Sequence, residues 1–422
     1  MKTRKTGVDA LARAAKEASR ALAVAPTAVK NRALRAMARA LRRRAGRVLA
    51  ANRVEVAAAK AAGRSAAFVD RLSLDRGRLD GVARALERVA ALPDPVGRTT
   101  PFSRRPNGLL LRRMRVPLGV VLIVYESRPG VTADAAGLCL KAGDAALLRG
   151  GKEAVRTNAE IAAALRAGLR AAGLPPGAVG FVADPDRAAV RRLLELDALI
   201  DLVIPRGGPE LTRAVRRDSA IPVLSHDRGV CHVYVDAGAD LRMAERIALN
   251  AKAERPGVCN AMETLLVHRG AARAFLPRLA RAMAAAGVEL RGDARARRIV
   301  PSMRPAADAD WDAEYLDLIL SVKVVRSLGD ALDHIARHGT GLAEAIVTRD
   351  RRRAARFLRE ADAGAVYVNA STRFTDGGEF GLGAEMGIST QKIHARGPVG
   401  LEGLTCEKFV VRGRGQVRDS RR

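Results

Sequence analysis

Two series of short apolar runs, each alternating with amphipathic stretches, constrain the fold of this chain more than any other feature. In the first series the apolar runs cover 119–125, 145–149, 179–182 and 199–204. Between them, apolar residues recur at helical spacing over 132–141, 153–172 and 188–194. The second series has apolar runs at 221–225, 231–235, 262–267, 321–325, 343–348 and 365–369. Because strands that alternate with helices form parallel sheets covered by helices, we predict an α/β protein with two such sheets.

Segments outside these two series predict helices and a small antiparallel element. Residues 7–92 have Ala and Leu at three- and four-residue spacing, which predicts successive helices. Residues 101–116 predict a hairpin, because the strong turn signal Asn107-Gly108 lies within this stretch. The segment 406–412 reads as a strand that could pair with this hairpin or extend the sheet of a neighbouring subunit. A length of 422 residues is enough for two domains and a small third element.

The charge of the chain allows two interpretations. The formal net charge is +29, and a basic surface attracts polyanions, so nucleic-acid binding is one of them. The arginines, however, are spread along helical segments, and aromatic residues make up only 3% of the chain, which leaves few rings to stack on bases. We therefore interpret the charge mainly as solvated helix faces that also steer phosphorylated ligands, and we expect no nucleic-acid partner.

The distribution of cysteines and apolar residues bears on the compartment. No apolar run reaches 18 residues and no apolar core follows the basic N-terminus, so we expect neither a membrane span nor a signal peptide. The four cysteines, Cys139, Cys231, Cys259 and Cys406, are far apart and show no metal-binding spacing. We expect no metal site, no disulfide framework and a cytoplasmic protein.

One cysteine is placed differently from the others. Cys259 follows the turn Pro256-Gly257, has the amide side chain of Asn260 next to it, and is soon followed by an apolar run. A thiol just after a tight turn can point into a cleft, where backbone N–H groups can face the thiolate or a nearby oxyanion. The alternative is that Cys259 is a small buried hydrophobe, as most unpaired cysteines are. Cys139 lies on an apolar helical stretch and Cys231 in a predicted strand, so we expect both to be core residues.

Two glycine-containing loops follow predicted strands. The first is Arg149-Gly150-Gly151-Lys152, and the second contains Arg206, Gly207 and Gly208 before Pro209. Ligands of open parallel sheets bind at the carboxyl ends of strands, so these loops are candidates for holding a phosphorylated cofactor. A single Gly-Gly after a strand is more often a plain turn, and the G-x-G-x-x-G fingerprint is absent from the sequence.

Several stretches, taken in order, resemble one known family. They are 116–129, 148–153, 204–208, 229–236, 250–266, 365–378, 381–385 and 389–398. The stretch around Cys259 resembles the cysteine loop of the aldehyde dehydrogenase superfamily, and the whole set resembles its gamma-glutamyl phosphate reductases, also called glutamate-5-semialdehyde dehydrogenases. No single motif is decisive, but the resemblance covers nearly the whole chain.

The resemblance implies an aldehyde dehydrogenase-like fold with two parallel α/β domains and a small β oligomerisation element. An NADP-binding domain would cover residues 1–232, interrupted by the hairpin 98–116 and completed by a return segment at about 375–400. A catalytic domain carrying Cys259 would cover 233–374. The C-terminal strand and tail, 401–422, would form the oligomerisation element together with the hairpin.

The resemblance also implies an activity, namely NADPH-dependent reduction of L-glutamyl 5-phosphate to L-glutamate 5-semialdehyde and phosphate, in proline biosynthesis. Cys259 would attack the γ-carbonyl carbon and form a thioester, with the Cys259 N–H and a side chain near Ser127 as oxyanion donors and Asn260 beside them. The alternative for Ser127 is a hydroxyl that caps a turn. The superfamily's glutamate base has no clear equivalent here, which suits a reaction that need not activate water. A homo-oligomer and a glutamate kinase partner are further expectations.

Cofactor- and substrate-binding residues are carried over in the same way. The cofactor loops would be Arg149, Gly150, Gly151 and Lys152, and Arg206, Gly207 and Gly208. Candidates for the glutamyl carboxylate, amine and phosphate are Glu126, Arg128, Asn250, Arg255, Asn369 and Arg373. Arginine binds carboxylate or phosphate bidentately, although any one arginine in so basic a chain is more often a surface residue.

The sequence departs from the family pattern at a few positions. Gly130 and Leu342 stand where Asn and His are usual, and the stretch 225–228 differs from the usual approach to Gly229. These departures bear on polar contacts and leave two alternatives to the reductase: a non-phosphorylating aldehyde dehydrogenase, and a basic nucleic-acid-binding protein without catalysis. The first alternative needs a base that activates water near Cys259, and the second predicts salt-sensitive binding to DNA or RNA.

Overall fold

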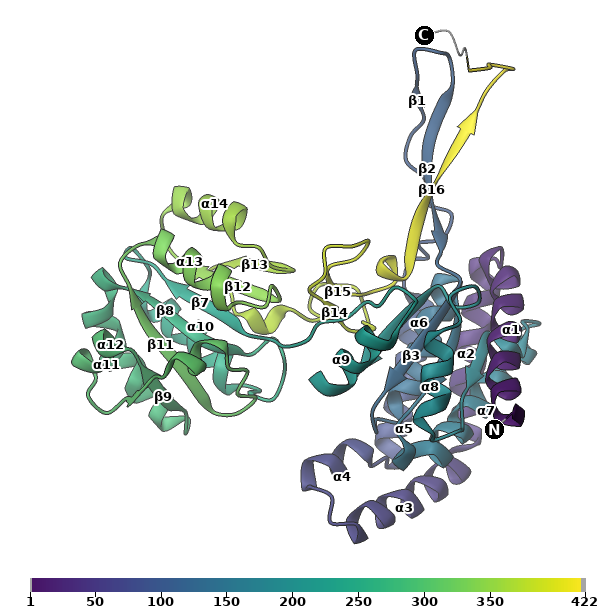
Figure 1. Ribbon diagram of the computed structural model, residues 1–422, viewed down its shortest axis with the longest axis horizontal. Helices are drawn as coiled ribbons and strands as arrows, with labels where there is room; N and C mark the ends of the chain where they lie inside the picture. Colours follow the sequence, from purple (N-terminus) through teal and green to yellow (C-terminus); the bar gives the residue numbers. More distant parts are fainter. Residues whose placement is uncertain (1, 419–422) are drawn as a thin grey trace. The chain divides into compact units, whose positions relative to one another are not determined.

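The computed structural model (Figure 1) describes residues 2–418 and contains two compact units. Among the described residues, unit 1 consists of 2–224, 382–387 and 399–418, and unit 2 of 225–381 and 388–398. The division after Leu224 precedes the predicted boundary at residue 232, because β7 (Cys231–Val235) pairs only within the sheet of unit 2. Of the predicted return segment, residues 388–398 belong to unit 2.

Unit 1 contains the first predicted parallel sheet. Its strands, in spatial order, are β5 (Val179–Phe181), β4 (Ala145–Arg149), β3 (Val120–Tyr125) and β6 (Leu202–Arg206). The connecting helices are α6 (Gly130–Ala142), α7 (Val155–Ala171) and α8 (Arg187–Leu194), and α9 (Pro209–Asp218) follows the last strand. β3 is buried along its whole length, as expected for a strand covered on both faces. The strand predicted at 221–225 is reduced to one bridge, between Val203 and Val223.

The predicted N-terminal helices are present and pack on this sheet's helices. They are α1 (Lys2–Ala23), α2 (Thr27–Arg43), α3 (Ala45–Ala61), α4 (Ala66–Leu72) and α5 (Arg76–Ala91). The apolar face of α2 is buried, and its solvent face has ion pairs such as Arg42 with Asp80 and with Glu87. These pairs support the interpretation of much of the positive charge as solvated helix surface.

The predicted hairpin and C-terminal strand form one antiparallel sheet within unit 1. β1 (Ser103–Arg104) pairs with β2 (Leu110–Pro117), and β2 pairs with β16 (Thr405–Arg412). Of the two predicted pairings for this strand, the chain makes the one with its own hairpin. Phe409 and Val411 on β16 are exposed. The last four residues of the predicted tail, 419–422, lie outside the described residues, and the oligomerisation role of this element stays a prediction.

Unit 2 contains a longer parallel sheet with helices on both faces. In spatial order its strands are β10 (Arg304–Pro305), β9 (Glu289–Gly292), β11 (Ile319–Val325), β8 (Met262–His268), β7, β12 (Ala343–Val347) and β13 (Ala365–Val368). The helices are α10 (Leu241–Ala253), α11 (Arg269–Ala285), α12 (Ala294–Ile299), α13 (Leu328–His338) and α14 (Arg351–Glu360), and a short pair, β14 (Ile388–Ser389) with β15 (Gly397–Pro398), completes the unit. One core lies between the sheet and α10 and α11, and a second lies on the face of α13 and α14.

Candidate active site

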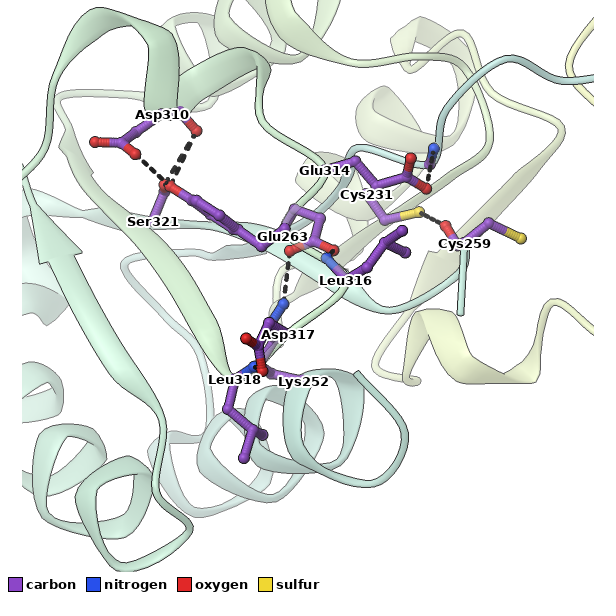
Figure 2. Close-up of polar contacts among 12 residues, drawn as sticks. Cys231, Lys252, Cys259, Glu263, Asp310, Glu314, Leu316, Asp317, Leu318 and Ser321 are labelled. Carbon is purple, nitrogen blue, oxygen red and sulfur yellow. Dashed lines mark hydrogen bonds and ion pairs between the residues drawn. The ribbon is translucent and has the colours of Figure 1, made fainter. Parts of the chain in front are cut away.

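Cys259 lies in the loop that connects α10 to β8, at the edge of the unit 2 sheet where its parallel strands begin. The side chain is half-buried, and the loop closes just after it with a hydrogen bond from Ala261 N to Val258 O of 3.0 Å. The buried Cys231 at the start of β7 donates its thiol to the Cys259 carbonyl oxygen, at 3.4 Å. In Figure 2 the sulfur of Cys259 points away from this contact. The loop backbone is therefore held from one side while the thiol faces the other.

A second contact fixes the same backbone. Gly229 lies so close to Cys259 that an added Cβ would be 1.9 Å from the Cys259 carbonyl oxygen and 2.8 Å from its Cα. The Gly229 N–H is in turn held by Glu314 Oε1 at 2.8 Å. Only glycine allows this approach of two backbones, which explains Gly229 by packing against the cysteine loop.

Asn260 and Arg373, two of the predicted site residues, are brought together. The Asn260 amide donates to Thr375 O at 2.9 Å and to Arg373 O at 3.4 Å, and its side-chain oxygen accepts from Arg373. Arg373 also pairs with Glu254 at 2.6 Å, and Thr372 Oγ1 donates to the Asn260 carbonyl at 2.8 Å. The Asn260 amide therefore ties the cysteine loop to residues 373 and 375, and its catalytic role stays a prediction.

A buried ion pair joins the two ends of the cysteine loop, and sequence reasoning missed it. Lys252 at the end of α10 and Glu263 on β8 are 2.6 Å apart, and both side chains are fully buried (Figure 2). Burial raises the pKa of Glu263 to about 7 against the opposing effect of Lys252, and burial lowers the pKa of Lys252 against the opposing effect of Glu263. The one signal in the sequence is a Lys and a Glu that flank the cysteine segment within otherwise apolar elements.

Cys259 lies where the strands of its sheet begin. In unit 1, by contrast, the candidate loops lie where the parallel strands end. Glu126, directly after β3, accepts a hydrogen bond from Gly208 N at 2.8 Å, and a Cβ on Gly207 would be 2.6 Å from the Glu126 carboxyl carbon. Gly208 precedes α9, so a carboxylate oxygen already lies at the N-terminus of this helix. Glu126, predicted to contact substrate, is thus part of the second predicted cofactor loop.

The first cofactor loop is packed against its own unit. A Cβ on Gly150 would be 2.3 Å from the Asn158 amide nitrogen, and one on Gly151 would be 2.6 Å from Ser127 Oγ. These glycines are therefore required by packing within the protein, whether or not a ligand approaches them. The buried Ser127 donates its hydroxyl to Glu153 at 3.0 Å.

The basic residues of the cofactor loops differ in their surroundings. Arg149 donates to Gly150 O at 3.1 Å and to Pro185 O at 2.7 Å, and burial lowers its pKa. Lys152 is exposed, and Arg206 is half-buried at the end of β6. Lys152 is thus the side chain of the first loop that extends into solvent.

The remaining substrate candidates lie on the surface, and their roles stay predictions. Asn250, Arg255 and Arg128 are exposed. Asn369 has a positive φ of 58° and exchanges two hydrogen bonds with the backbone of Thr348, of 2.9 and 3.0 Å, at the edge where β12 and β13 end. This is the edge opposite the one that holds Cys259.

Other expectations concern the rest of the chain. Cys139 and Cys231 are fully buried, and burial raises the pKa of both thiols, as expected for core residues. Within residues 2–418 no group of His, Cys, Asp and Glu side chains is arranged to hold a metal ion. Among the helices described, none has the length and apolar character needed to cross a membrane.

Comparisons with known proteins place this geometry in context. The family model for the aldehyde dehydrogenase family matches residues 1–310 and 311–384. A gamma-glutamyl phosphate reductase from Anaeromyxobacter sp. (strain K) is 57% identical over 412 residues, covering 97% of this chain and 96% of that protein. The crystal structure of the gamma-glutamyl phosphate reductase from Thermotoga maritima has a TM-score of 0.96 at 46% identity, covering 98% of this chain and 100% of that one. An acetylating aldehyde dehydrogenase from Geobacillus thermoglucosidasius, at 18% identity, coverage of 99% of both chains and a TM-score of 0.67, shares the fold.

Proposed function

Because the chain belongs to the aldehyde dehydrogenase family and, within it, to the gamma-glutamyl phosphate reductases, we propose that it reduces L-glutamyl 5-phosphate to L-glutamate 5-semialdehyde in proline biosynthesis. The family makes it an oxidoreductase that uses a nicotinamide cofactor, and the proposal specifies NADPH. We further propose a cytoplasmic homo-oligomer assembled through β2 and β16, with glutamate kinase as a partner that supplies the acyl phosphate.

The observation that carries this proposal is the fixed backbone of the Cys259 loop. Cys231, Gly229 and the Lys252–Glu263 pair hold that loop. A rigid backbone lets the Cys259 thiolate meet the γ-carbonyl carbon in one geometry. A carbon–sulfur bond forms, the carbon–oxygen bond to phosphate breaks, and inorganic phosphate leaves with the bonding electrons, which gives a thioester on Cys259.

The developing oxyanion is assigned to the Cys259 backbone N–H. Ser127 would serve the same oxyanion only after its hydroxyl leaves Glu153, to which it donates at 3.0 Å. Asn260 acts indirectly, since it ties the loop to residues 373 and 375. Arg373 pairs with Glu254, and a substrate carboxylate or phosphate would compete with that carboxylate for the guanidinium.

We propose that the cofactor binds at the edge of unit 1 where the strands end. A carboxylate oxygen of Glu126 already accepts from Gly208 at the start of α9, so this helix N-terminus accommodates an anionic oxygen of the kind a pyrophosphate offers. Residues 206–208 would hold the pyrophosphate, and Lys152 would pair with the phosphate on the adenosine side. When bound, the reduced nicotinamide supplies the hydride that converts the thioester to the aldehyde with release of the Cys259 thiolate.

The test follows NADP⁺ reduction with glutamate 5-semialdehyde, with and without phosphate, in the wild type and in Cys259→Ser. Phosphate-dependent turnover that the variant loses is the expected result. Cys406→Ser is the matched control, because Cys406 is also half-buried and lies on β16, outside the loop.

Other outcomes separate the alternatives. Turnover without phosphate would identify a non-phosphorylating aldehyde dehydrogenase, and turnover retained in Cys259→Ser would remove the proposed nucleophile. Absence of turnover in the folded wild type, together with salt-sensitive binding of DNA, would favour the nucleic-acid interpretation.

A further inference from the structure

Unit 2 contains a cavity of about 340 Å³ that none of the predicted site residues lines. It is bounded by the end of α13, the turn 339–341, the end of α14, and the segment 390–396. The polar residues at its wall include Glu344 on β12, Asp362 after α14, and Lys392 and Arg396. A volume at the lower end of the range for ligand pockets, about 300–1,000 Å³, suits a small molecule.

The cavity and Cys259 lie on different faces of the sheet. Ala343 belongs to the small core that Cys259 packs against, and Glu344, the next residue of the strand, points to the opposite face. Ile346, two residues further on, lies in the core formed with α13 and α14. The cavity is therefore separate from the cysteine loop.

Glu344 leaves one buried oxygen without a partner. The side chain is fully buried, and its Oε2 accepts from His232 N and contacts His232 Nδ1, both at 3.0 Å. Its Oε1 has no hydrogen-bond partner. An unpaired buried acceptor destabilises the folded state, so a ligand that donates to Oε1 would remove this penalty.

Arg396, which also lines the cavity, has a buried donor without a partner. Its two terminal nitrogens donate to Asp362, at 2.7 Å to the carboxylate and 3.2 Å to the carbonyl oxygen, whereas its Nε is buried and has no partner. Lys392 pairs with the same Asp362 carboxylate at 2.5 Å. Two cations therefore share the Asp362 carboxylate. The other carboxylate on this side of the cavity, Glu360, is itself paired with Arg356 and Arg359, so a net positive charge remains here.

We propose that this cavity binds a free α-amino acid in its zwitterionic form. The ammonium group donates to Glu344 Oε1, and the carboxylate accepts from Arg396 Nε and neutralises the excess positive charge beside Lys392. Burial raises the pKa of Glu344, and an ammonium group would supply the positive charge that favours its ionised form. The small volume favours a short side chain.

The experiment measures binding to the full chain by calorimetry and by ligand-observed NMR. The probes are glycine, L-alanine, L-proline and L-glutamate, with propionate and ethylamine as the two halves of alanine that each lack one charge. We expect at least one amino acid to bind saturably and both halves to bind at least tenfold more weakly. Glu344→Gln and Arg396→Gln should each weaken binding at least tenfold, while Cys259→Ser binds as the wild type does.

The control is Arg352→Gln, since Arg352 is exposed on α14 and lies outside the cavity wall. Thermal melts establish that each variant is folded, and Arg396→Lys serves as a milder second variant if Arg396→Gln is not. The proposal is overturned if no amino acid binds, if propionate binds as tightly as alanine, or if the two cavity variants bind normally. A parallel rise in the KM for glutamate 5-semialdehyde in both cavity variants would overturn it as well, because the cavity would then hold the substrate itself. The binding outcomes do not depend on whether the proposed reductase activity is observed.

Discussion

The two units of this protein place their candidate functional loops at opposite ends of parallel strands. In unit 1 the loops after β3, β4 and β6 lie where the strands end, and backbone N–H groups and glycines dominate them. In unit 2 Cys259 lies where β8 begins, and side chains such as Lys252, Glu263 and Asn260 hold its loop. The first arrangement suits a ligand that brings its own charge, and the second suits one reactive side chain held in a fixed position.

The largest expected effect tests whether side chains hold the cysteine loop. Glu263→Gln leaves Lys252 charged and fully buried without its partner, and breaking such a pair costs about 3–5 kcal/mol. We expect the urea midpoint of unit 2 to fall accordingly. The double variant Lys252→Met, Glu263→Leu removes both charges and should recover most of the loss. If the single variant has wild-type stability, the loop is held by its backbone contacts alone.

The next prediction concerns the backbone approach behind Cys259. Gly229→Ala puts a methyl group 1.9 Å from the Cys259 carbonyl oxygen, so one of the two backbones must move. A misplacement of the nucleophile by about 1 Å lowers kcat about 100-fold. The affinity for NADP⁺, which we propose binds to unit 1, should stay unchanged. The matched control is Gly238→Ala, where an added Cβ meets nothing within 4 Å. Equal activity in the two variants would contradict a fixed cysteine loop.

The sequence predicts the loops of unit 1 better than the contacts that hold the cysteine loop of unit 2. The strands and helices around β3, β4 and β6 are predictable, because buried parallel strands read as continuous apolar runs and the glycine loops follow them directly. The position of Cys259 on a turn is predictable from Pro256-Gly257. Its anchors are not, since Cys231, Gly229 and Glu314 reach it from distant parts of the chain, and no local pattern encodes such contacts. The short β9 and the helix α12 also carry too few residues for a periodic signal.

A smaller effect probes electrostatics in unit 1. Asp134 on α6 experiences burial, which raises its pKa to about 6, against the opposing effect of Arg206 and Arg88. Because the folded state binds this proton more tightly than the unfolded state does, stability falls as pH rises from about 4 to about 6, and stays lower above that window. The loss is on the order of 1–2 kcal/mol after allowance for partial exposure of the residue. Asp134→Asn should remove this fall in stability with pH, which urea unfolding curves between pH 4 and 7 would measure. Asp197→Asn, at an exposed position, should not remove it.

The smallest predicted effect tests whether the loop 206–208 of unit 1 is open to a ligand or held by a side chain, as the cysteine loop of unit 2 is. If the N-terminus of α9 receives the cofactor's pyrophosphate, the Glu126 carboxylate that now accepts from Gly208 N at 2.8 Å opposes it by like charge. Glu126→Gln keeps the size of the side chain and removes that charge, so NADP⁺ should bind more tightly, by about two- to fivefold for a helix-end interaction of about 0.3–1 kcal/mol. Fluorescence titration of the cofactor measures the change, and Glu195→Gln, an exposed carboxylate at the end of α8, is the matched control. Weaker binding in Glu126→Gln would show instead that the carboxylate holds the loop 206–208 in place, and unit 1 would then rely on side-chain anchors just as the cysteine loop of unit 2 does.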